Sequence, residues 1–401
     1  MTTVTAEQPL GDVDVCDIDP YSEESLRNPL AYASRIREAG RAVWIPRYEM
    51  WAIGRFDHVK AALENWQVFV SGFGTALNDW RNKKLWRPPS LLLDTDPPDH
   101  ERYRAALSPA VASFRARRPE LETRAAELVE RLVALGRFDA VTDLAEPFIT
   151  RVFGDAVGLP EEGREHLLPY GELAFNSFGP ENWLVEKARH KGGPAVEWVT
   201  QACRRSSLKP GGMGAMAFQA VDAGKIGEEE AERLVRSFLT AGLDTTINSI
   251  SATLRHLSES PEDWARLHAD PALARAAFEE TLRFESPATI LYRCIEADIE
   301  FAGVQMKKGG KLMLSVIGAN HDPNQFSEPG RYDMSRRTPS VGFGWGIHTC
   351  IGQMIARTEG EILLSAMAKR IAQLKPAGEA VRRLNNTVRG FGSVPLSVIA
   401  R

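Results

Sequence analysis

One cysteine stands in a glycine-punctuated run of a kind that can bind a metal-containing group. The run is FGWGIHTCIG, residues 343–352, and Cys350 precedes a segment with helical periodicity. The start of a helix presents unpaired N–H groups and the positive end of the helix dipole, which favour the metal-binding thiolate. Gly344, Gly346 and Gly352 leave room for a flat, bulky group near the backbone. Haem is such a group, and cysteine thiolate is one of its axial ligands.

Three other interpretations of this run stay open at the level of the residues. A lone cysteine is most often a small buried apolar side chain. A glycine-rich loop before a helix can bind phosphate, but no lysine followed by a hydroxyl residue stands after the last glycine. A zinc site needs more ligands than Cys350 and His348, and no second cysteine lies nearby. The haem interpretation is the strongest of the four.

A second candidate lies inside a long apolar-periodic stretch, residues 228–256, which predicts one helix of roughly 40 Å. Thr245 can donate to the carbonyl of Ala241, four residues earlier, which bends a helix and opens a groove beside Gly242. Burying the carboxylate of Asp244 in an apolar helix costs free energy, which a functional role would explain, and one such role is relaying protons as a general acid. A plain polar patch on a helix is the alternative.

Two charged pairs have helical spacing. Glu280 and Arg283 lie three residues apart, so they share a helix face and can form an ion pair. His100 and Arg104 lie four apart in DPPDHERYR, a typical helix start, and present two donors on one face. Taken alone, each pair is equally an ordinary surface feature.

The elements that must position these residues are mainly helical. Strand-like runs are short and few, whereas long stretches have apolar residues three and four apart. We therefore expect a mainly α fold with a small β-rich lobe, in one domain over residues 21–401 after an N-terminal arm, residues 1–20. The strands are expected at residues 43–53, 299–304, 311–317 and 394–399, and clear helices at 125–135 and 271–283.

Composition limits the partners of this chain. It has 401 residues, 43% of them hydrophobic, and a formal net charge of −4, so nothing points to nucleic acid. The four cysteines are scattered without a pairing pattern, as expected in a reducing compartment. The first 20 residues are polar and acidic and contain no apolar run. These features predict a cytoplasmic protein that binds neither nucleic acid nor membrane.

The motifs together resemble the cytochrome P450 monooxygenases. Residues 343–352 match F-G-x-G-x-H-x-C-x-G, residues 241–246 match A/G-G-x-D/E-T-T/S, and residues 280–283 match E-x-x-R, in the family's order. The resemblance runs over essentially the whole chain. It implies a haem b cofactor with Cys350 as the iron ligand, and O2 as co-substrate.

The resemblance also implies roles for other positions. Asp244 and Thr245 are implied to deliver protons in catalysis. Glu280 and Arg283, with Arg336 from a later meander, are implied to support the cysteine loop. Electrons are implied to come from a 2Fe–2S ferredoxin and a separate reductase, since no flavin or nicotinamide motif is visible. The other implied haem contacts are His100, Arg104, Arg293 and His348 at the propionates, together with Ala241, Phe343 and Gly352.

The chain is most similar to the bacterial subgroup that oxidises para-substituted benzoates such as 4-methoxybenzoate. Residues 86–90 (WRPPS), 175–180 (FNSFGP) and 236–237 carry this similarity. A carboxylate entering an apolar pocket needs donors, and Phe175 and Phe178 on one helix face would sandwich an aromatic ring. The implied substrate contacts are Arg87, Ser90, Leu93, Phe175, Phe178, Arg236, Ser237, Thr240, Ala241, Ala288 and Leu291.

Several positions depart from these patterns, and two other functions stay open. Leu291 stands where the subgroup has Phe, His321 where the family has Arg, and Trp345 is unusual in the cysteine loop. Arg87 alone is equally a surface charge, and Phe175 and Phe178 alone are more typical of a core. The first alternative is the same chemistry on another small aromatic or a terpenoid substrate. The second is a non-catalytic haem sensor.

Overall fold

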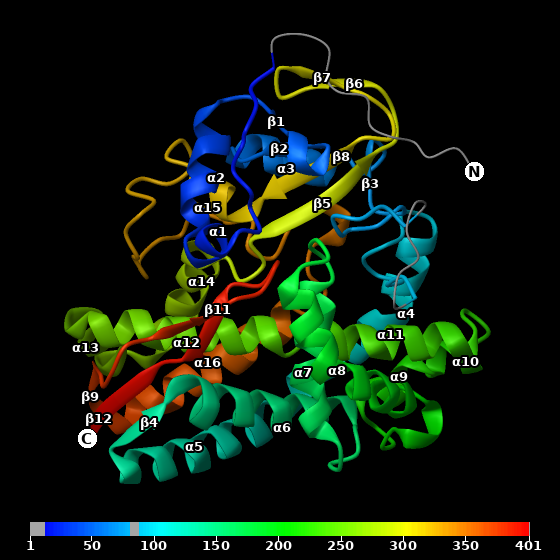
Figure 1. Ribbon diagram of the computed structural model, residues 1–401. Helices are drawn as coiled ribbons and strands as arrows, with labels where there is room; N and C mark the ends of the chain where they lie inside the picture. Colours follow the sequence, from blue (N-terminus) through cyan, green and yellow to red (C-terminus); the bar gives the residue numbers. More distant parts are fainter. Residues whose placement is uncertain (1–12, 81–87, 401) are drawn as a thin grey trace.

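The computed structural model describes residues 13–80 and 88–400, and most of them are helical. The helices gather in the lower half of Figure 1, where α11 and α12 run across the molecule. The bounds of this half are α4 (Asp99–Ser113), α5 (Arg118–Leu135), α6 (Glu146–Val157), α7 (Leu167–Asn176), α8 (Trp183–Ala202), α9 (Met213–Ala217), α10 (Gln219–Asp222), α11 (Glu228–Ala241), α12 (Asp244–Glu259), α13 (Pro261–Ala269), α14 (Ala274–Phe284) and α16 (Gln353–Arg370).

The upper half is built around a mixed five-stranded sheet, in the order β1-β2-β8-β5-β3. β2 and β8 pair in parallel, and every residue of β8 is buried, as expected for a strand covered on both faces. The bounds are β1 (Val43–Ile45), β2 (Met50–Ile53), β3 (Phe69–Val70), β5 (Ile290–Ile295) and β8 (Lys311–Ser315), with the hairpin β6 (Ile299–Phe301) and β7 (Val304–Met306) and the helices α1 (Glu23–Arg27), α2 (Pro29–Glu38), α3 (Phe56–Glu64) and α15 (Val316–Asn320).

The C-terminal strands return to the helical half. β4 (Arg137–Asp139), β12 (Pro395–Ala400) and β9 (Ile371–Pro376) form one small antiparallel sheet, with β12 in the middle. β10 (Val381–Arg383) and β11 (Gly390–Ser393) form another. The turn between β10 and β11 reaches the upper half, because Val388 forms a bridge with Ala288. The expected mainly α fold with a small β-rich part is therefore confirmed.

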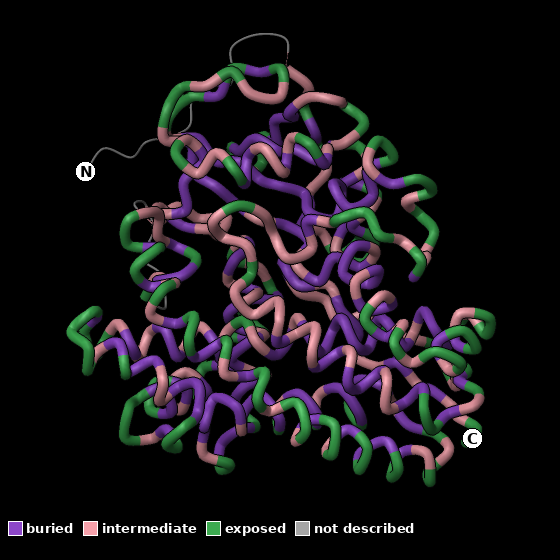
Figure 2. Tube along the Cα trace, turned by 180° about the vertical axis from the view of Figure 1, so that it is seen from behind, coloured by how far each residue is buried: buried purple, intermediate pink, exposed green. Residues whose placement is uncertain are grey.

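The core is divided in the same way as the fold. One large apolar cluster fills the helical half, and two smaller clusters lie on the faces of the five-stranded sheet. Figure 2 shows buried inner turns and exposed outer turns on the lower helices, which is the pattern expected of amphipathic helices around a core. The expected strands at 43–53 and 394–399 and the expected helices at 125–135 and 271–283 occur with shifted bounds. The run 299–304 spans β6 and the start of β7, and the last two residues of the run 311–317 belong to α15.

The long helix expected over residues 228–256 is the main correction. It is interrupted at Gly242 and Leu243, so that α11 ends at Ala241 and α12 begins at Asp244. A Cβ added at Gly242 would lie 2.3 Å from the Phe153 ring, so the interruption brings the backbone close to α6. The apolar spacing does not reveal this interruption, because α11 buries Leu234, Val235, Phe238 and Leu239 and α12 is buried along most of its length.

The described part of the N-terminal arm is attached to the sheet edge. Cys16 N donates to Trp44 O at 2.8 Å, and Trp44 N donates to Asp14 O at 2.8 Å. Val15 pairs with Trp44 as an isolated parallel bridge. Residues 13–16 therefore extend the edge next to β1.

Candidate active site

A cavity of about 280 Å³ lies where the helical half meets the β-rich half. One wall comes from α11 and α12, and another from residues 341–352 and the start of α16. Leu291 of β5 and Val316 of α15 line it from the upper half. Cys350 and Thr245, from the two sequence motifs, therefore line the same cavity.

The Cys350 loop is closed by its own backbone. Gly344 N donates to Val341 O at 2.9 Å, and Cys350 N donates to Phe343 O at 2.9 Å. The first residue of α16 is Gln353, so Cys350 lies just before the helix rather than as its first residue. The N–H groups at this helix start still lie next to the sulfur.

The electrostatics at the sulfur are mixed. Burial raises the pKa of the Cys350 thiol, while the N–H groups of Gly352 and Gln353 and the charges of Arg104 and Arg357 oppose this rise. The side chain is accessible, but only because it faces the cavity. A coordinated metal ion deprotonates a thiol outright. The site thus suits a thiolate that is bonded to a cation inside the cavity.

The loop rests on α3 through Trp345 and Gly346. Trp345 Nε1 donates to Glu64 Oε1 at 2.8 Å, and Lys60 Nζ lies 4.9 Å from the centroid of the Trp345 ring. Gly346 has a φ of 69°, and a Cβ there would lie 2.5 Å from Leu63 O. Only glycine permits this approach. Trp345, whose role the sequence left open, fastens the cysteine loop to α3.

Residues expected at the haem propionates gather beside the cavity. The ring centroids of His100 and His348 lie 4.3 Å apart, and Arg104 and His348 line the cavity. Burial lowers the pKa of His100 to about 4 and that of Arg293 to about 10. The charge of Arg293 also lowers the pKa of both histidines, which places it near them.

These side chains are left with unused donors. Both ring nitrogens of His100 are buried and have no hydrogen-bond partner within residues 13–80 and 88–400. Nε2 of His348 forms no hydrogen bond there either, but it lies 3.8 Å from Oδ1 of Asp96. Buried polar atoms normally have a partner, so the two unpartnered nitrogens of His100 beside guanidinium groups point to an anionic group that belongs there. Haem propionates would meet this requirement, and Cys350, which would hold the iron, lines the same cavity.

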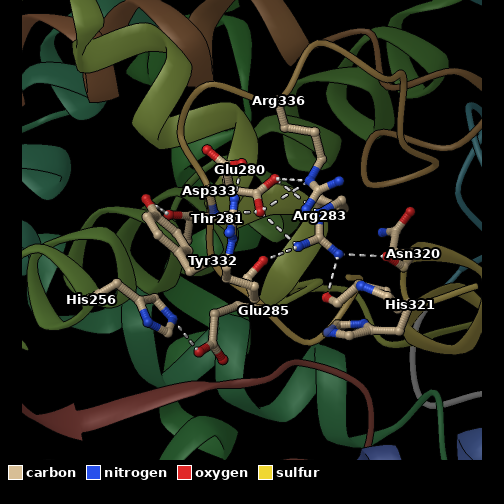
Figure 3. Close-up of polar contacts among 12 residues, drawn as sticks. His256, Glu280, Thr281, Arg283, Glu285, Asn320, His321, Tyr332, Asp333 and Arg336 are labelled. Atoms are coloured by element: carbon tan, nitrogen blue, oxygen red, sulfur yellow. Dashed lines mark hydrogen bonds and ion pairs between the residues drawn. The ribbon is translucent and has the colours of Figure 1, made fainter. Parts of the chain in front are cut away.

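The Glu280–Arg283 pair and its expected third member form a buried cluster, which Figure 3 shows. Arg283 Nη2 donates to Glu280 Oε1 at 2.6 Å, and Arg283 Nε donates to Glu280 Oε2 at 2.9 Å. Arg336 Nε lies 3.4 Å from Glu280 Oε2. The remaining donors of Arg283 bind the carbonyl oxygens of Asn320, Pro329 and Arg331.

This cluster reaches the cysteine loop through Asn320. Its carbonyl accepts from Arg283, and its Oδ1 accepts from the N–H of Val341, where the loop begins, at 2.9 Å. The next residue, His321, replaces the family's arginine. Its Nδ1 lies 3.0 Å from Ile317 O, and burial lowers its pKa to about 4, so a neutral side chain occupies this position.

The Thr245 hydroxyl has the expected local bond. Thr245 Oγ1 donates to Ala241 O at 3.1 Å, across the interruption between α11 and α12. Ala241, Gly242 and Thr245 all line the cavity. The groove predicted from a back-bonding threonine beside a glycine is therefore present.

Asp244 points away from the cavity, toward α7 and the C-terminal strands. It is buried, and its Oδ1 lies 3.6 Å from Nη2 of Arg383. Burial raises the pKa of Asp244 to about 6, against the opposing charge of Arg383, and Glu172 and Glu146 raise it further. Arg383 is partly exposed and also lies 3.5 Å from Glu146. The pKa of the Asp244 carboxyl thus lies close to neutrality, and the partly exposed side chain of Arg383 lies between this carboxyl and solvent.

The structure brings most of the expected substrate contacts together. α11 presents one face to the cavity, and the other contacts come from the loop before α4, from α7 and from the segment leading into β5. The expected contacts that line the cavity are Ser90, Leu93, Phe175, Arg236, Ser237, Thr240, Ala241, Ala288 and Leu291.

Two expected contacts differ. Phe178 was expected on the same helix face as Phe175, and this was wrong because α7 ends at Asn176. Phe178 is absent from the cavity lining and packs on Phe175 instead, with ring centroids 6.1 Å apart. The proposed sandwich of a substrate ring between these two rings is therefore not formed. Arg87 lies outside the described residues.

Arg233 is a cavity residue that the sequence did not single out. It lines the cavity, and its Nη2 donates to Pro89 O at 2.8 Å. Its Nε is buried and has no partner in the described part of the chain. The signal was present, because Arg233 lies three residues before Arg236 and four before Ser237, on the same helix face.

Comparison with known proteins decides the family. The family model described as "Cytochrome P450" matches residues 213–396. The chain is 43% identical over 385 residues to "Cytochrome p450 CYP199A2" of Rhodopseudomonas palustris, covering 95% of this chain and 93% of the relative. The chain is a member of the cytochrome P450 family. It is also 28% identical over 395 residues to a vitamin D(3) 25-hydroxylase of Pseudonocardia autotrophica, covering 95% and 96% of the two chains.

Solved P450 structures share the fold of this P450. CYP108D1 from Novosphingobium aromaticivorans superposes with a TM-score of 0.83 at 24% identity, covering 96% of this chain and 97% of the other. The family uses haem b and O2 for monooxygenation, so this P450 is a haem monooxygenase. Bacterial P450s take their electrons from ferredoxin and reductase partners. In the part of the chain that the structure describes, no helix combines the length and apolarity needed to cross a bilayer.

Proposed function

We propose that this P450 oxidises para-substituted benzoates, by O-demethylation of 4-methoxybenzoate or by hydroxylation of para-alkyl groups. The observation that carries the proposal is the layout of one face of α11. Arg233, Arg236 and Ser237 line one stretch of the cavity, and Ala241 lines it next to Thr245. Ser237 and Ala241 lie four positions apart in the helix, which is about 6 Å along the axis.

That spacing matches a benzoate. A carboxylate held by Arg236 and Ser237 places a para substituent roughly one ring length away, beside Ala241 and Thr245. Guanidinium groups bind carboxylates in a defined plane and with charge-assisted bonds, so they fix the direction of the ring axis. Holding the ring by its far end selects which C–H bond lies at the reactive centre.

The apolar side chains support the same pose. Phe175 of α7 and Leu291 of β5 both line the cavity. An aromatic ring gains from contact with Phe175. Leu291 is smaller than phenylalanine and leaves more room there, which favours larger para substituents.

Haem, when bound, supplies the iron at which O2 is activated and from which one oxygen atom passes to the substrate. We propose that Cys350 is its ligand and that His100, Arg104, Arg293 and His348 hold its propionates. Thr245 offers its hydroxyl to oxygen in the cavity. At present this hydroxyl donates to Ala241 O at 3.1 Å, and a stronger acceptor in the cavity would replace that bond.

Asp244 is proposed to resupply the proton. Its pKa of about 6 lets it hold a proton part of the time at neutral pH, and its neighbour Arg383 is partly exposed to solvent. A general acid is most effective when its pKa lies near the working pH. Since Asp244 faces away from the cavity, a proton reaches Thr245 only after the carboxyl moves or through intervening water.

A 2Fe–2S ferredoxin with a separate reductase is proposed as the electron source, and a cytoplasmic location stays a prediction. A basic docking surface for the ferredoxin would need exposed cations, and the candidates are Arg102, Arg115, Arg117 and Arg118. Three of them pair with carboxylates: Arg102 with Glu230, Arg117 with Glu120, and Arg118 with Glu122 and Glu361. These carboxylates offset the positive charge of the three arginines, so a basic docking surface at these positions has little support.

The direct experiment is a substrate titration of the haem-loaded ferric protein. Para-substituted benzoates are added while the low-spin to high-spin change of the haem is monitored, with 4-methoxybenzoate first. Turnover with a ferredoxin and its reductase is then expected to give formaldehyde and 4-hydroxybenzoate in equal amounts. A protein that shows no spin change with any para-substituted benzoate, yet responds to neutral aromatics or terpenoids, would contradict the proposed substrate class.

A further inference from the structure

We infer that Asp94 is a positioning residue that sets Ser90 as a donor for the substrate's carboxylate. The inference rests on the proposed benzoate function. Asp94 is only 4% exposed, and its carboxylate joins two segments of chain. Oδ1 accepts from N and Oγ1 of Thr75 at 3.0 and 2.7 Å, and Oδ2 accepts from N of Ser90 at 2.7 Å.

The bond to Asp94 places Ser90 in a turn that leaves its proton available. Ser90 Oγ accepts from Leu93 N at 3.2 Å and from Leu92 N at 3.4 Å. The hydroxyl proton has no acceptor among the residues that the structure describes, and Ser90 lines the cavity. A hydroxyl whose acceptor side is occupied by N–H groups can only donate, which is what a carboxylate needs.

Other bonds hold the same segment from two further directions. Arg233 of α11 donates to Pro89 O at 2.8 Å. Thr95 Oγ1 donates to Leu91 O at 2.7 Å. Residues 89–95 are thus fixed against α11, while Ser237 on that helix donates to Arg233 O at 3.2 Å. Ser90 and Ser237 line the cavity as two separate hydroxyls near two guanidinium groups.

The charge of Asp94 would by itself oppose this role. A negative carboxylate near an anionic substrate weakens its binding. Arg293 and Lys311 offset part of this charge: burial lowers the pKa of each cation, and the nearby charge of Asp94 raises it. Removing the charge should therefore strengthen acid binding if Asp94 acts only through its charge. Removing it should weaken acid binding if Asp94 acts by holding Ser90. The two effects have opposite signs, so one measurement separates them.

The test uses two ligands of the same shape in the haem-loaded full chain. The ligands are 4-methoxybenzoate and its neutral isostere 4-nitroanisole, and their dissociation constants are measured from the spin-state change. With Asp94→Asn, binding of 4-methoxybenzoate is expected to weaken about tenfold, the effect of one bond to a charged group, with 4-nitroanisole almost unchanged. Ser90→Ala is expected to give the same loss, and the double variant no more than either alone, because both changes remove one interaction.

Two further variants serve as controls. Thr75→Val removes one bond to Oδ1 but leaves the N–H bonds of Thr75 and Ser90, so the preference for the acid should persist. Asp94→Glu keeps the charge but moves the oxygens by a methylene, so the preference should fall as in Asp94→Asn. If Asp94→Asn does not load haem, Asp94→Glu provides the same test.

Three results would overturn the inference. Tighter binding of 4-methoxybenzoate by Asp94→Asn would show that only charge matters. An equal loss for both ligands would show a general structural role. Full retention of the preference in Asp94→Glu would show that the oxygen positions are unimportant. A wild-type protein without any preference for the acid would instead refute the proposed function itself, and the inference with it.

Discussion

The carboxylate of Asp244 occupies the space that a side chain on Gly171 would fill. A Cβ added at Gly171 would lie 1.9 Å from Asp244 Oδ2. Gly171 lies in α7, and Asp244 is the first residue of α12, so the missing side chain lets a buried carboxyl pack against a neighbouring helix. This contact, with Arg383, holds the carboxyl that we propose as proton donor away from the cavity.

Gly171→Ala should therefore displace the Asp244 carboxylate. We expect product formed per O2 consumed to fall severalfold, with haem content retained, because the displaced carboxyl loses its contact with Arg383. The measurement is the ratio of product to O2 consumed at neutral pH.

A matched glycine in a neighbouring helix provides the control. Gly193 in α8 has no atom within 4 Å of an added Cβ, so Gly193→Ala should leave the ratio unchanged and slightly stabilise the helix. An unchanged ratio in Gly171→Ala would mean that the position of Asp244 does not limit proton delivery.

Asp244 should make stability fall as pH rises. Its pKa is about 6 in the folded protein, against an ordinary value of about 3.9 in the unfolded chain. Between these values the folded protein keeps a proton that the unfolded chain has lost, so the free energy of unfolding decreases. Two pKa units correspond to about 3 kcal/mol, fully present below pH 4 and lost above pH 6.

Urea unfolding of wild type and Asp244→Asn across this range measures the effect. Relative to wild type, Asp244→Asn is expected to gain about 3 kcal/mol between pH 4 and pH 7, because asparagine carries no such titration. A constant difference between the two proteins across that range would show that the carboxyl is not shifted.

Thr245 should matter through its hydroxyl and not through its shape. Thr245→Ala removes the donor that lines the cavity, and we expect product per O2 to fall about tenfold, the effect of one lost bond to a charged acceptor. Hydrogen peroxide should account for the missing O2. Thr245→Ser keeps the hydroxyl and should stay within about twofold of wild type. Equal yields from the alanine and serine variants would remove Thr245 from the mechanism.

The Glu280–Arg283 pair should be a large contributor to stability. Both side chains are at most 2% exposed, and truncating Glu280 leaves a buried guanidinium without its partner. Glu280→Ala should cost about 3–5 kcal/mol of unfolding free energy, with reduced haem retention because Asn320 ties this cluster to the cysteine loop.

A surface glutamate supplies the comparison for that loss. Glu259, with a side chain 45% exposed, pairs with Arg255, and Glu259→Ala should cost less than about 1 kcal/mol. Chemical denaturation of both variants checks the contrast. Similar losses at the two positions would mean that burial does not determine the effect.

Local rules predicted some of this geometry correctly. The Thr245–Ala241 bond and the Glu280–Arg283 pair join residues three or four positions apart, and helix periodicity fixes such contacts without the rest of the fold. The Cys350 motif is also local, since its glycines and its helix start lie within a few residues of the sulfur.

Contacts between distant segments were not predictable from these patterns. The interruption at Gly242 depends on Phe153, and the Arg233 bond to Pro89 spans 144 residues of chain. The end of α7 before Phe178 was not marked by proline or by a glycine directly after the helix, so spacing alone placed that ring on the wrong surface. Such positions are set by packing, which a single sequence does not display.

The central claim is that Cys350 binds haem iron as a thiolate, and the carbon monoxide complex of the reduced protein tests it most directly. We predict the red-shifted Soret band typical of thiolate-ligated haem, and its loss in Cys350→His with haem still bound. A wild-type protein that takes up haem but lacks that band, or a Cys350→His variant that keeps it, would contradict the account.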